Sequence, residues 1–435
     1  MSYATKDIRN IALLGHGGNG KSTLAESMLY LTGAIDRLGS TAAGNSVSDY
    51  DAEEIRRHIS ISASTMYVEY QKTKINIIDT PGYFDFAGEV AQALRVADTG
   101  IICVSAKDGL NVGAEKAWKS LTDAKLPRAI YISKLDEEHA DYFATLEQLR
   151  DKFGPSVSPM AAPIVEGGKP TGIVDIIARK AYKYDGGKRS EIPVPASMAD
   201  RVEELYNEIA ENAAGTSEEL MEKYLETMEL SADEIYGALS TGIADGEIVP
   251  VFCGSAVTGM GTTVLLDAIR NFFPAPMELG KPVDAAGTTK AIVYKTISDQ
   301  FGKFSLFKVI SGKVTPDMTL TNARSGAQEK LGHIYYVQGK KTVEVQELSC
   351  GDIGAVSKLS DTKTGDTLCD GKAVEAVPGI EFARPCYSMC ISPKVKGQDD
   401  KVAQGLARLG EEDRSFTVTN NAETKQMVIA GAGDI

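Results

Sequence analysis

The segment Gly15–Thr23, GHGGNGKST, limits the possible folds of this chain more than any other stretch. It follows the apolar run Ile8–Leu14 and precedes a helical pattern over Lys21–Thr32. Its spacing, Gly-x4-Gly-Lys-Ser, is typical of a loop between a strand and a helix whose backbone N–H groups hold phosphate oxygens. The sequence therefore predicts a strand–loop–helix unit that binds a nucleoside triphosphate.

Individual residues of this loop have separate expected roles. The backbone N–H groups and the helix N-terminus would surround the β-phosphate. Lys21 would reach the β- and γ-phosphates, and the hydroxyl of Ser22 would bind Mg²⁺. By itself the loop indicates a nucleoside triphosphate without identifying its base. The loop residues predicted to bind the nucleotide are Gly15, His16, Gly17, Gly18, Asn19, Gly20, Lys21, Ser22 and Thr23.

Apolar strand-like runs alternate with helical patterns through the first part of the chain. This alternation is typical of a parallel α/β sheet, so residues 1–280 are interpreted as an α/β P-loop domain. The expected strands are Ile8–Leu14, Ile61–Tyr70, Lys74–Asp79, Gly100–Ser105, Arg128–Ser133 and Ile248–Cys253. The expected helices are Lys21–Thr32, Phe84–Val96, Val112–Ala124, Ala140–Phe153 and Thr262–Phe273.

Residues from about 155 to 246 interrupt the alternation and predict an inserted α+β subdomain. Strand-like pieces at Gly172–Ile177 and Lys180–Tyr184 come first. Acidic segments with helical spacing follow, at residues 198–211 and 216–228. Their acidic face is interpreted either as solvated surface or as a docking surface for a partner.

Two smaller domains are expected after a linker rich in proline and glycine, residues 272–287. Short β-branched and aromatic runs over residues 285–375 predict an antiparallel β-barrel. Residues 383–435 read as a partial ferredoxin-like α/β sandwich that lacks one helix and one strand, so we expect a piece of a longer protein. Its expected elements are the strand Cys386–Ile391, the helix Asp399–Leu409 and the strands Ser415–Asn420 and Gln426–Ala430.

Composition excludes several classes of protein. The formal net charge of −14 argues against a protein that coats nucleic acid non-specifically, and no DNA partner is expected. The 6 cysteines lack metal-ligand spacing, which predicts buried free thiols in a reducing compartment. No apolar run approaches the roughly 20 residues that span a bilayer. With no apolar signal segment and no coiled-coil pattern, a cytoplasmic monomer without a membrane partner is expected.

Polar motifs at three other strand ends indicate which base is bound. Asp79, in the motif DTPG, ends a strand where a carboxylate can hold Mg²⁺, and the N–H of Gly82 would sense the γ-phosphate. Asp136, in the motif SKLD, can accept hydrogen bonds from both N1–H and N2–H₂ of guanine, which adenine does not offer together. A backbone N–H in the motif GSA would meet guanine O6. The residues predicted to contact the base are Ser133, Lys134, Asp136, Gly254, Ser255 and Ala256.

The order GHGGNGKS, RRHIS, DTPG, SKLD and GSA resembles the translational GTPases. The whole chain resembles elongation factor G, and more closely the elongation factor G-like paralogues that carry DTPGY. The stretches FAGEV, LRVADTGI and IVPVFCGSAV add to the resemblance. The resemblance implies GTP and GDP with Mg²⁺ as ligands, the ribosome as partner, and a GTP hydrolysis cycle that changes the geometry between domains.

Several residues depart from the family pattern. Ser60 stands where switch I has threonine, and its hydroxyl keeps the expected role of Mg²⁺ ligand with Ser22 and Asp79. His58 replaces a glycine, which restricts the backbone there. Ser133 replaces the asparagine of the guanine motif and loses the reach of the amide, so base discrimination depends more on Asp136. Gly18 replaces an aspartate that can help to hold a monovalent cation.

Tyr83 is the departure with the greatest consequence for mechanism, because elongation factor G has a histidine that orients the attacking water at this position. Phosphoryl transfer to water depends mainly on positioning and on charge stabilisation. We therefore interpret Tyr83, with Gly82 and Lys21, as catalytic, and expect slow hydrolysis unless a partner stimulates it. The alternative is that Tyr83 only packs and the enzyme is nearly silent.

The sequence thus predicts a GTP-hydrolysing translation factor that acts on the ribosome. The alternative is a GTP-gated ribosome-binding protein, for regulation or protection, with little hydrolysis of its own. An adenine-nucleotide enzyme is opposed by SKLD and GSA. Several lysines are interpreted either as contacts to ribosomal RNA or as ordinary solvated side chains: Lys303, Lys308, Lys313, Lys340, Lys341, Lys394 and Lys396.

Overall fold

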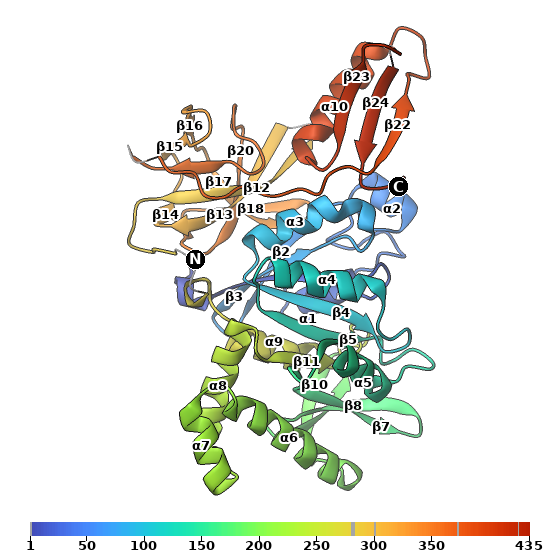
Figure 1. The fold of residues 1–435 in the computed structure, drawn as a ribbon, viewed down its shortest axis with the longest axis vertical. Helices are drawn as coiled ribbons and strands as arrows, with labels where there is room; N and C mark the ends of the chain where they lie inside the picture. Colours follow the sequence, from blue (N-terminus) through green and yellow to red (C-terminus); the bar gives the residue numbers. More distant parts are fainter. Residues whose placement is uncertain (1, 280–282, 300–301, 372–373, 425) are drawn as a thin grey trace.

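Three structural units follow one another along the chain (Figure 1). The computed structural model describes residues 2–279, 283–299, 302–371, 374–424 and 426–435. Part of the expected linker, residues 280–282, lies outside the described residues. The first unit runs from β1 to α9, the second from β12 to β21, and the third from β22 to β24.

A seven-stranded sheet with the order β2-β3-β1-β4-β5-β11-β6 forms the centre of the first unit. Every neighbouring pair is parallel except β2 with β3, which is antiparallel. The expected parallel sheet thus has one antiparallel edge strand, where a two-residue turn joins β2 directly to β3. The strands are β1 (Ile8–Leu14), β2 (Ser64–Tyr70), β3 (Thr73–Asp79), β4 (Thr99–Ser105), β5 (Arg128–Ser133), β6 (Val157–Pro159) and β11 (Val249–Cys253).

The helices that flank this sheet begin where capping residues allow. Asp141 and Asn111 accept hydrogen bonds from the backbone N–H groups of Ala144 and Ala114, so α5 and α4 start directly after them. The expected helix over 84–96 opens instead with a 3₁₀ turn. The helices are α1 (Lys21–Leu31), α3 (Ala87–Val96), α4 (Val112–Asp123), α5 (Tyr142–Phe153) and α9 (Thr262–Phe272), with 3₁₀ turns at Thr5–Asp7, Phe84–Phe86, Ala196–Met198 and Pro276–Glu278.

The short helix α2 (Ala52–Arg57) was not expected from the sequence. Asp51 caps its first turn, and the side chain of Glu54 accepts from the backbone N–H of Asp51 in return. This reciprocal pair stabilises a helix of only six residues, which is too short to show an apolar period. The same region corrects the predicted strand Ile61–Tyr70: β2 begins only at Ser64 because the N–H groups of residues 61–63 are bound by side chains.

The insert begins later than predicted, after Pro159, because β6 pairs with β11 in the central sheet. Its own sheet is antiparallel with the order β10-β9-β8-β7. Apolar residues of α6 at helical spacing are buried in the same core as the central sheet, and Figure 1 places the insert helices at the far end of the molecule from the third unit. The elements are β7 (Ala161–Glu166), β8 (Lys169–Asp175), β9 (Lys180–Asp185), β10 (Lys188–Ile192), α6 (Ala199–Ala214), α7 (Glu218–Thr227) and α8 (Ala232–Asp245).

The second unit is antiparallel throughout, with an eight-stranded sheet of order β16-β15-β21-β12-β13-β20-β17-β18. It has a hydrophobic core of its own, in which Val293, Phe307 and Val356 are buried. Its strands are β12 (Lys290–Asp299), β13 (Gly302–Ser311), β15 (Thr319–Asn322), β16 (Gln328–Lys330), β17 (Ile334–Gln338), β18 (Lys341–Val345), β20 (Ile353–Ser357) and β21 (Thr367–Cys369), with the separate pair β14 (Lys313–Val314) and β19 (Leu348–Ser349).

The third unit has the expected order of strand, helix, strand and strand, paired as β22-β24-β23. Cys386 and Cys390 are exposed, which corrects the expectation of buried thiols for these two. The reason is that β22 is an edge strand whose residues from Tyr387 to Cys390 are all exposed, on both faces; the other four cysteines are buried. The elements are β22 (Tyr387–Ile391), α10 (Asp399–Glu412), β23 (Thr417–Asn421) and β24 (Gln426–Gly431).

Ion pairs between buried side chains join the first and second units. Lys74 contacts Asp352 at 2.7 Å and Lys308 contacts Asp98 at 2.6 Å. A further lysine of β12 pairs with a glutamate of α3. Lys308 is therefore neither a solvated lysine nor an RNA contact, because its partners among the described residues are Asp98 and the carbonyl of Val96 inside the interface.

Candidate functional site

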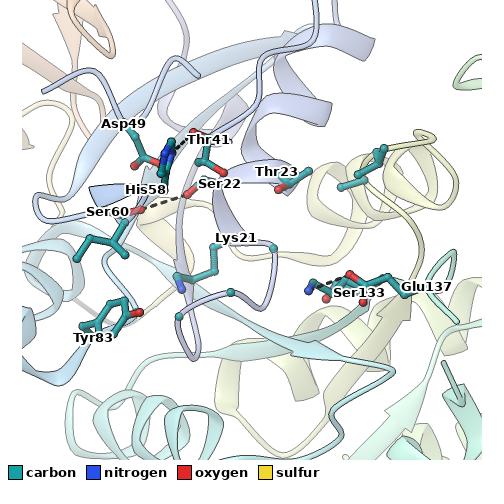
Figure 2. Close-up of a pocket in the computed structure, with 18 of the residues that line it drawn as sticks. Lys21, Ser22, Thr23, Thr41, Asp49, His58, Ser60, Tyr83, Ser133 and Glu137 are labelled. Atoms are coloured by element: carbon teal, nitrogen blue, oxygen red, sulfur yellow. Dashed lines mark hydrogen bonds and ion pairs between the residues drawn. The ribbon is translucent and has the colours of Figure 1, made fainter. Parts of the chain in front are cut away.

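A cavity of about 440 Å³ opens at the carboxyl edge of the central sheet (Figure 2). Residues from segments far apart in the sequence meet there, because the carboxyl ends of parallel strands share one edge. The predicted site residues that line it are Gly17, Gly18, Gly20, Lys21, Ser22, Thr23, Ser60, Gly82, Tyr83, Ser133, Lys134, Asp136 and Ala256. The cavity is also lined by Thr41, Asp49, His58, Ile59, Glu137 and Val257, which the sequence did not single out as site residues.

Other predicted residues support the cavity from behind without lining it. Gly15 approaches β4 so closely that an added Cβ would lie 2.5 Å from the carbonyl oxygen of Cys103. The side-chain amide of Asn19 donates to the same carbonyl at 2.9 Å. Gly254 leaves no room for a side chain either, since a Cβ would lie 2.1 Å from the carbonyl oxygen of Met260. The predicted residues outside the lining are Gly15, His16, Asn19, Asp79, Gly254 and Ser255.

Lys21 is a buried cation inside the phosphate loop, with 5% of its surface exposed. Its Nζ donates to the carbonyl oxygens of Gly15 and His16, at 3.0 Å each. Burial lowers the pKa of Lys21, while the nearby charge of Asp79 acts in the opposite direction. No carboxylate among the described residues forms an ion pair with Lys21, so its charge is available to a bound anion.

A cluster of hydroxyl and carboxylate oxygens lies beside Lys21. The hydroxyl oxygens of Ser22 and Ser60 are 3.4 Å apart (Figure 2). Asp79, at the end of β3, and Asp49 are both buried, and each has one carboxylate oxygen without a hydrogen-bond partner within the described part of the chain. Burial and the charge of the other carboxylate raise the pKa of Asp49 to about 6, and burial raises the pKa of Asp79 to about 6.

This donor set fits Mg²⁺, which prefers hydroxyl and carboxylate oxygens. Buried carboxylate oxygens that lack a hydrogen bond are costly unless a cation meets them. Asp49 was missed by the sequence analysis, because only its place in the fold brings it next to Ser60 and Asp79. The feature of the sequence that could have indicated Asp49 is its position shortly before the RRHIS motif.

The opposite end of the cavity is formed by the motif SKLD. The Ser133 hydroxyl donates to the carbonyl oxygens of Asn19, at 2.8 Å, and Val104, at 3.2 Å. This hydroxyl therefore ties the phosphate loop to the sheet. Lys134 pairs with Glu137 at 3.0 Å, and Asp136 is exposed to the cavity. Glu137 is thus paired with a lysine, whereas Asp136 forms no ion pair among the described residues.

Tyr83 and His58 both lie at the end of the cavity that contains Lys21 and Ser60, away from Ser133 (Figure 2). The Tyr83 ring packs against Gly17, where an added Cβ would lie 3.2 Å from ring atom Cε2, and 42% of Tyr83 is exposed. His58 has a left-handed backbone, with φ of 54°, and its Nδ1 lies 3.3 Å from the carbonyl oxygen of Thr41. The predicted backbone restriction at His58 thus appears as a conformation that glycine would adopt more easily.

Three family models match consecutive parts of the chain. Residues 6–275 match the elongation factor Tu GTP binding domain, residues 288–371 match elongation factor G domain 2, and residues 382–435 match elongation factor G domain III. A crystal structure of a protein from Thermus thermophilus is also similar, with a TM-score of 0.92 and 33% sequence identity. The match covers 99% of this chain and 64% of that chain, so this chain spans less than two thirds of that relative.

Proposed function

Because this chain belongs to the elongation factor G family of translational GTPases, we propose that it binds GTP and GDP with Mg²⁺, hydrolyses GTP and acts on the ribosome. The observation that carries the proposal is the cavity itself. It combines a buried lysine without a carboxylate partner among the described residues and two buried carboxylates with unbonded oxygens. An anion that brings its own divalent cation satisfies both groups at once.

We propose the following roles at the phosphate end of the cavity. Lys21 would leave the loop carbonyls and bind the β- and γ-phosphates, and the N–H of Gly82 would meet the γ-phosphate. Ser22, Ser60 and Asp79 would hold Mg²⁺, and Asp49 would complete the oxygen cluster. The metal supplies neutralisation of the charge that develops on the phosphate oxygens.

At the base end, Asp136 would accept the N1–H and N2–H₂ donors of guanine, with Lys134 beside the base. A backbone N–H of the segment Gly254–Ala256 would meet O6. The contacts of the Ser133 hydroxyl with Asn19 and Val104 support a bracing role for Ser133. Preference for guanine over adenine would then depend mainly on Asp136.

Tyr83 would line the position of the attacking water. Its contact with Gly17 and its place in the cavity lining support this role. A phenol can donate or accept a hydrogen bond but carries no positive charge, so hydrolysis would be slow without a partner. Ribosomes would accelerate it by ordering the water and the switch segments.

Single-turnover GTP hydrolysis with and without purified ribosomes tests this function. We expect wild-type protein to be slow alone and faster with ribosomes, Tyr83→His to be faster, and Tyr83→Phe to be slower. Tyr30→Phe is the matched control, because Tyr30 is a similarly exposed tyrosine on α1 outside the cavity lining. Equal ribosome-stimulated rates for wild type and Tyr83→Phe would remove the phenol from the mechanism.

The second candidate is a GTP-gated ribosome-binding protein with little hydrolysis. The partly exposed tyrosine at the water position favours it. Ribosome pelleting with GTP, GDP and a non-hydrolysable GTP analogue, combined with turnover counts, separates the two candidates. GTP-dependent pelleting without turnover supports the second candidate.

We also propose a domain division at residues 1–280, with an insert, 285–375 and 383–435. The three consecutive family matches support this division. No helix among the described residues is long and apolar enough to cross a membrane. By family, a cytoplasmic location is proposed.

A further inference from the structure

Three consecutive backbone N–H groups follow the proposed Mg²⁺ ligand Ser60, and carboxylates accept hydrogen bonds from all of them. Oε1 of Glu54 accepts from Ile61 and from Ser62, at 3.0 Å each. Oε2 of Glu89 accepts from Ala63 at 2.5 Å. Both glutamates are buried, so these are charge-assisted bonds in a site of low water content. These bonds fix the path of the backbone directly after Ser60.

The two glutamates come from different elements. Glu54 lies on α2 and also accepts from the N–H of Asp51, so it ties this short helix to the segment after Ser60. Glu89 lies on α3, the helix that follows Tyr83 and its 3₁₀ turn. The segment that follows Ser60 is thus held by side chains of both α2 and α3.

The positive charge that neutralises Glu89 comes from the second unit. Lys295 on β12 forms an ion pair with Oε2 of Glu89, and each side chain is 5% exposed. That same carboxylate oxygen holds the N–H of Ala63. A buried carboxylate that loses its cation is strongly destabilised. The bond to Ala63 therefore depends on the docking of the second unit.

A β-bulge in β12 directs the side chain of Lys295 toward Glu89. In the pairing of β12 with β13, Val293 faces Phe307 and Lys295 faces Leu306, so Tyr294 is an extra residue. Both Tyr294 and Lys295 are buried against the first unit. The Tyr294 hydroxyl lies 2.7 Å from the Thr65 hydroxyl on β2, two residues after Ala63. The bulge thus directs two neighbouring side chains of the second unit to the segment that follows Ser60.

We propose that Lys295, acting through Glu89, is a positioning residue for Ser60, and that this one contact of the second unit selectively strengthens the binding of the GTP form with Mg²⁺. The inference rests on the proposed function. Ser60 lies at the end of the cavity with Lys21 and Tyr83, away from Ser133 (Figure 2). That is the end where the γ-phosphate would lie, which GDP lacks. By linkage, GTP with Mg²⁺ also strengthens the contact between Lys295 and Glu89.

The other buried lysines of the interface offer a matched control. Lys308 pairs with Asp98 at 2.6 Å and donates to the carbonyl of Val96 at 2.9 Å. Its side chain is 7% exposed, close to the value for Lys295. Neither of its partners bonds to the segment after Ser60. Replacing Lys308 therefore weakens the interface without touching the bonds that hold that segment.

The experiment compares the dissociation constants of a fluorescent non-hydrolysable GTP analogue and of fluorescent GDP at several Mg²⁺ concentrations. For Lys295→Met and Glu89→Gln we expect the GTP analogue to bind about tenfold more weakly, with GDP affinity nearly unchanged. Lys308→Met should keep the wild-type ratio of the two constants. Lys295→Arg should also keep the wild-type ratio, because arginine retains the positive charge. A general loss of stability would weaken the binding of both nucleotides alike, and it would not distinguish Lys295→Met from Lys308→Met.

Amide hydrogen exchange on the wild-type protein gives a second measurement that needs no variant to fold. The amides of Ile61 to Ala63 should be more protected with the GTP analogue and Mg²⁺ than with GDP. Equal protection, or the same selective loss in Lys308→Met as in Lys295→Met, overturns the inference and leaves the proposed function intact. A wild-type protein that binds neither nucleotide overturns both.

Discussion

At the scale of single residues, Gly82 has very little freedom within the cavity. A Cβ there would lie 2.4 Å from the backbone nitrogen of Gly17 and 2.6 Å from Nζ of Lys21. Atoms at these distances overlap, so the turn after β3 can approach the phosphate loop only with glycine at this position. The proposed contact of the Gly82 N–H with a γ-phosphate depends on that approach.

Gly82→Ala should therefore displace Gly17 or Lys21. Because the proposed site binds both nucleotides through the phosphate loop, the affinities for the GTP analogue and for GDP should both fall by about tenfold or more. Fluorescent nucleotide titration measures this change. Gly237→Ala is the matched control, because Gly237 lies in α8 and an added Cβ there would meet no atom within 4 Å. It should leave both affinities unchanged and stabilise the helix slightly. Wild-type affinity in Gly82→Ala would contradict the close approach.

At the scale of elements, α2 is a short helix that depends on its cap. The carboxylate of Asp51 accepts from the N–H of Glu53 at 2.8 Å, and Glu54 completes a capping box. Helix α8 has the same device, formed by Ser231 and Glu234. The two helices differ in place, since α2 precedes Ser60 whereas α8 belongs to the insert. Comparing α2 with α8 therefore distinguishes the effect of a lost cap on helix stability from its effect on nucleotide binding.

Asp51→Ala should destabilise α2 by about 1 kcal/mol, and through the loss of order at Glu54 it should weaken binding of the GTP analogue about fivefold. Ser231→Ala should destabilise α8 by a similar amount and leave nucleotide affinity unchanged. Amide exchange of each helix measures local stability, and nucleotide titration measures affinity. If both variants change nucleotide affinity alike, α2 has no special connection to the site.

At the scale of the whole molecule, the interface between the first and second units depends on buried charge. Lys74 and Asp352 are fully buried, and Lys74 lies 3.2 Å from the centre of the Tyr336 ring. Burial lowers the pKa of Lys74 to about 8, with Asp352 acting in the opposite direction. The folded protein therefore releases the Lys74 proton at a lower pH than the unfolded chain does.

This shift predicts a pH dependence with a definite sign. Between about pH 8 and the ordinary lysine pKa, the unfolded chain binds more protons at Lys74 than the folded protein, so the contribution of Lys74 to stability rises with pH. Below about pH 8 this gain is absent. The difference in unfolding free energy between wild type and Lys74→Met should thus shift in favour of wild type from about pH 8 to about pH 10. Denaturant titrations at each pH measure it, and a flat difference would contradict the lowered pKa.

Expectations from the sequence held where a local pattern is sufficient. Gly-x4-Gly-Lys-Ser after an apolar run specifies a strand, a phosphate loop and a helix, and β1 and α1 begin at the predicted residues, Ile8 and Lys21. The alternation of strands and helices likewise indicated the central sheet. The antiparallel direction of β2 and the short helix α2 were not predicted, because a tight turn and a capping box leave almost no periodic signal.

What the sequence determined by itself is the residue pattern of the loops: Gly-x4-Gly-Lys-Ser, an acid at the end of β3, and the carboxylate that is proposed to bind guanine, each set by neighbouring residues. Only the tertiary structure decided which other charges support them. Asp49, Glu89 and Lys295 look like ordinary surface charges in the sequence, yet all three are buried. Their partners are distant along the chain, and burial is what makes a charged residue depend so strongly on its partner.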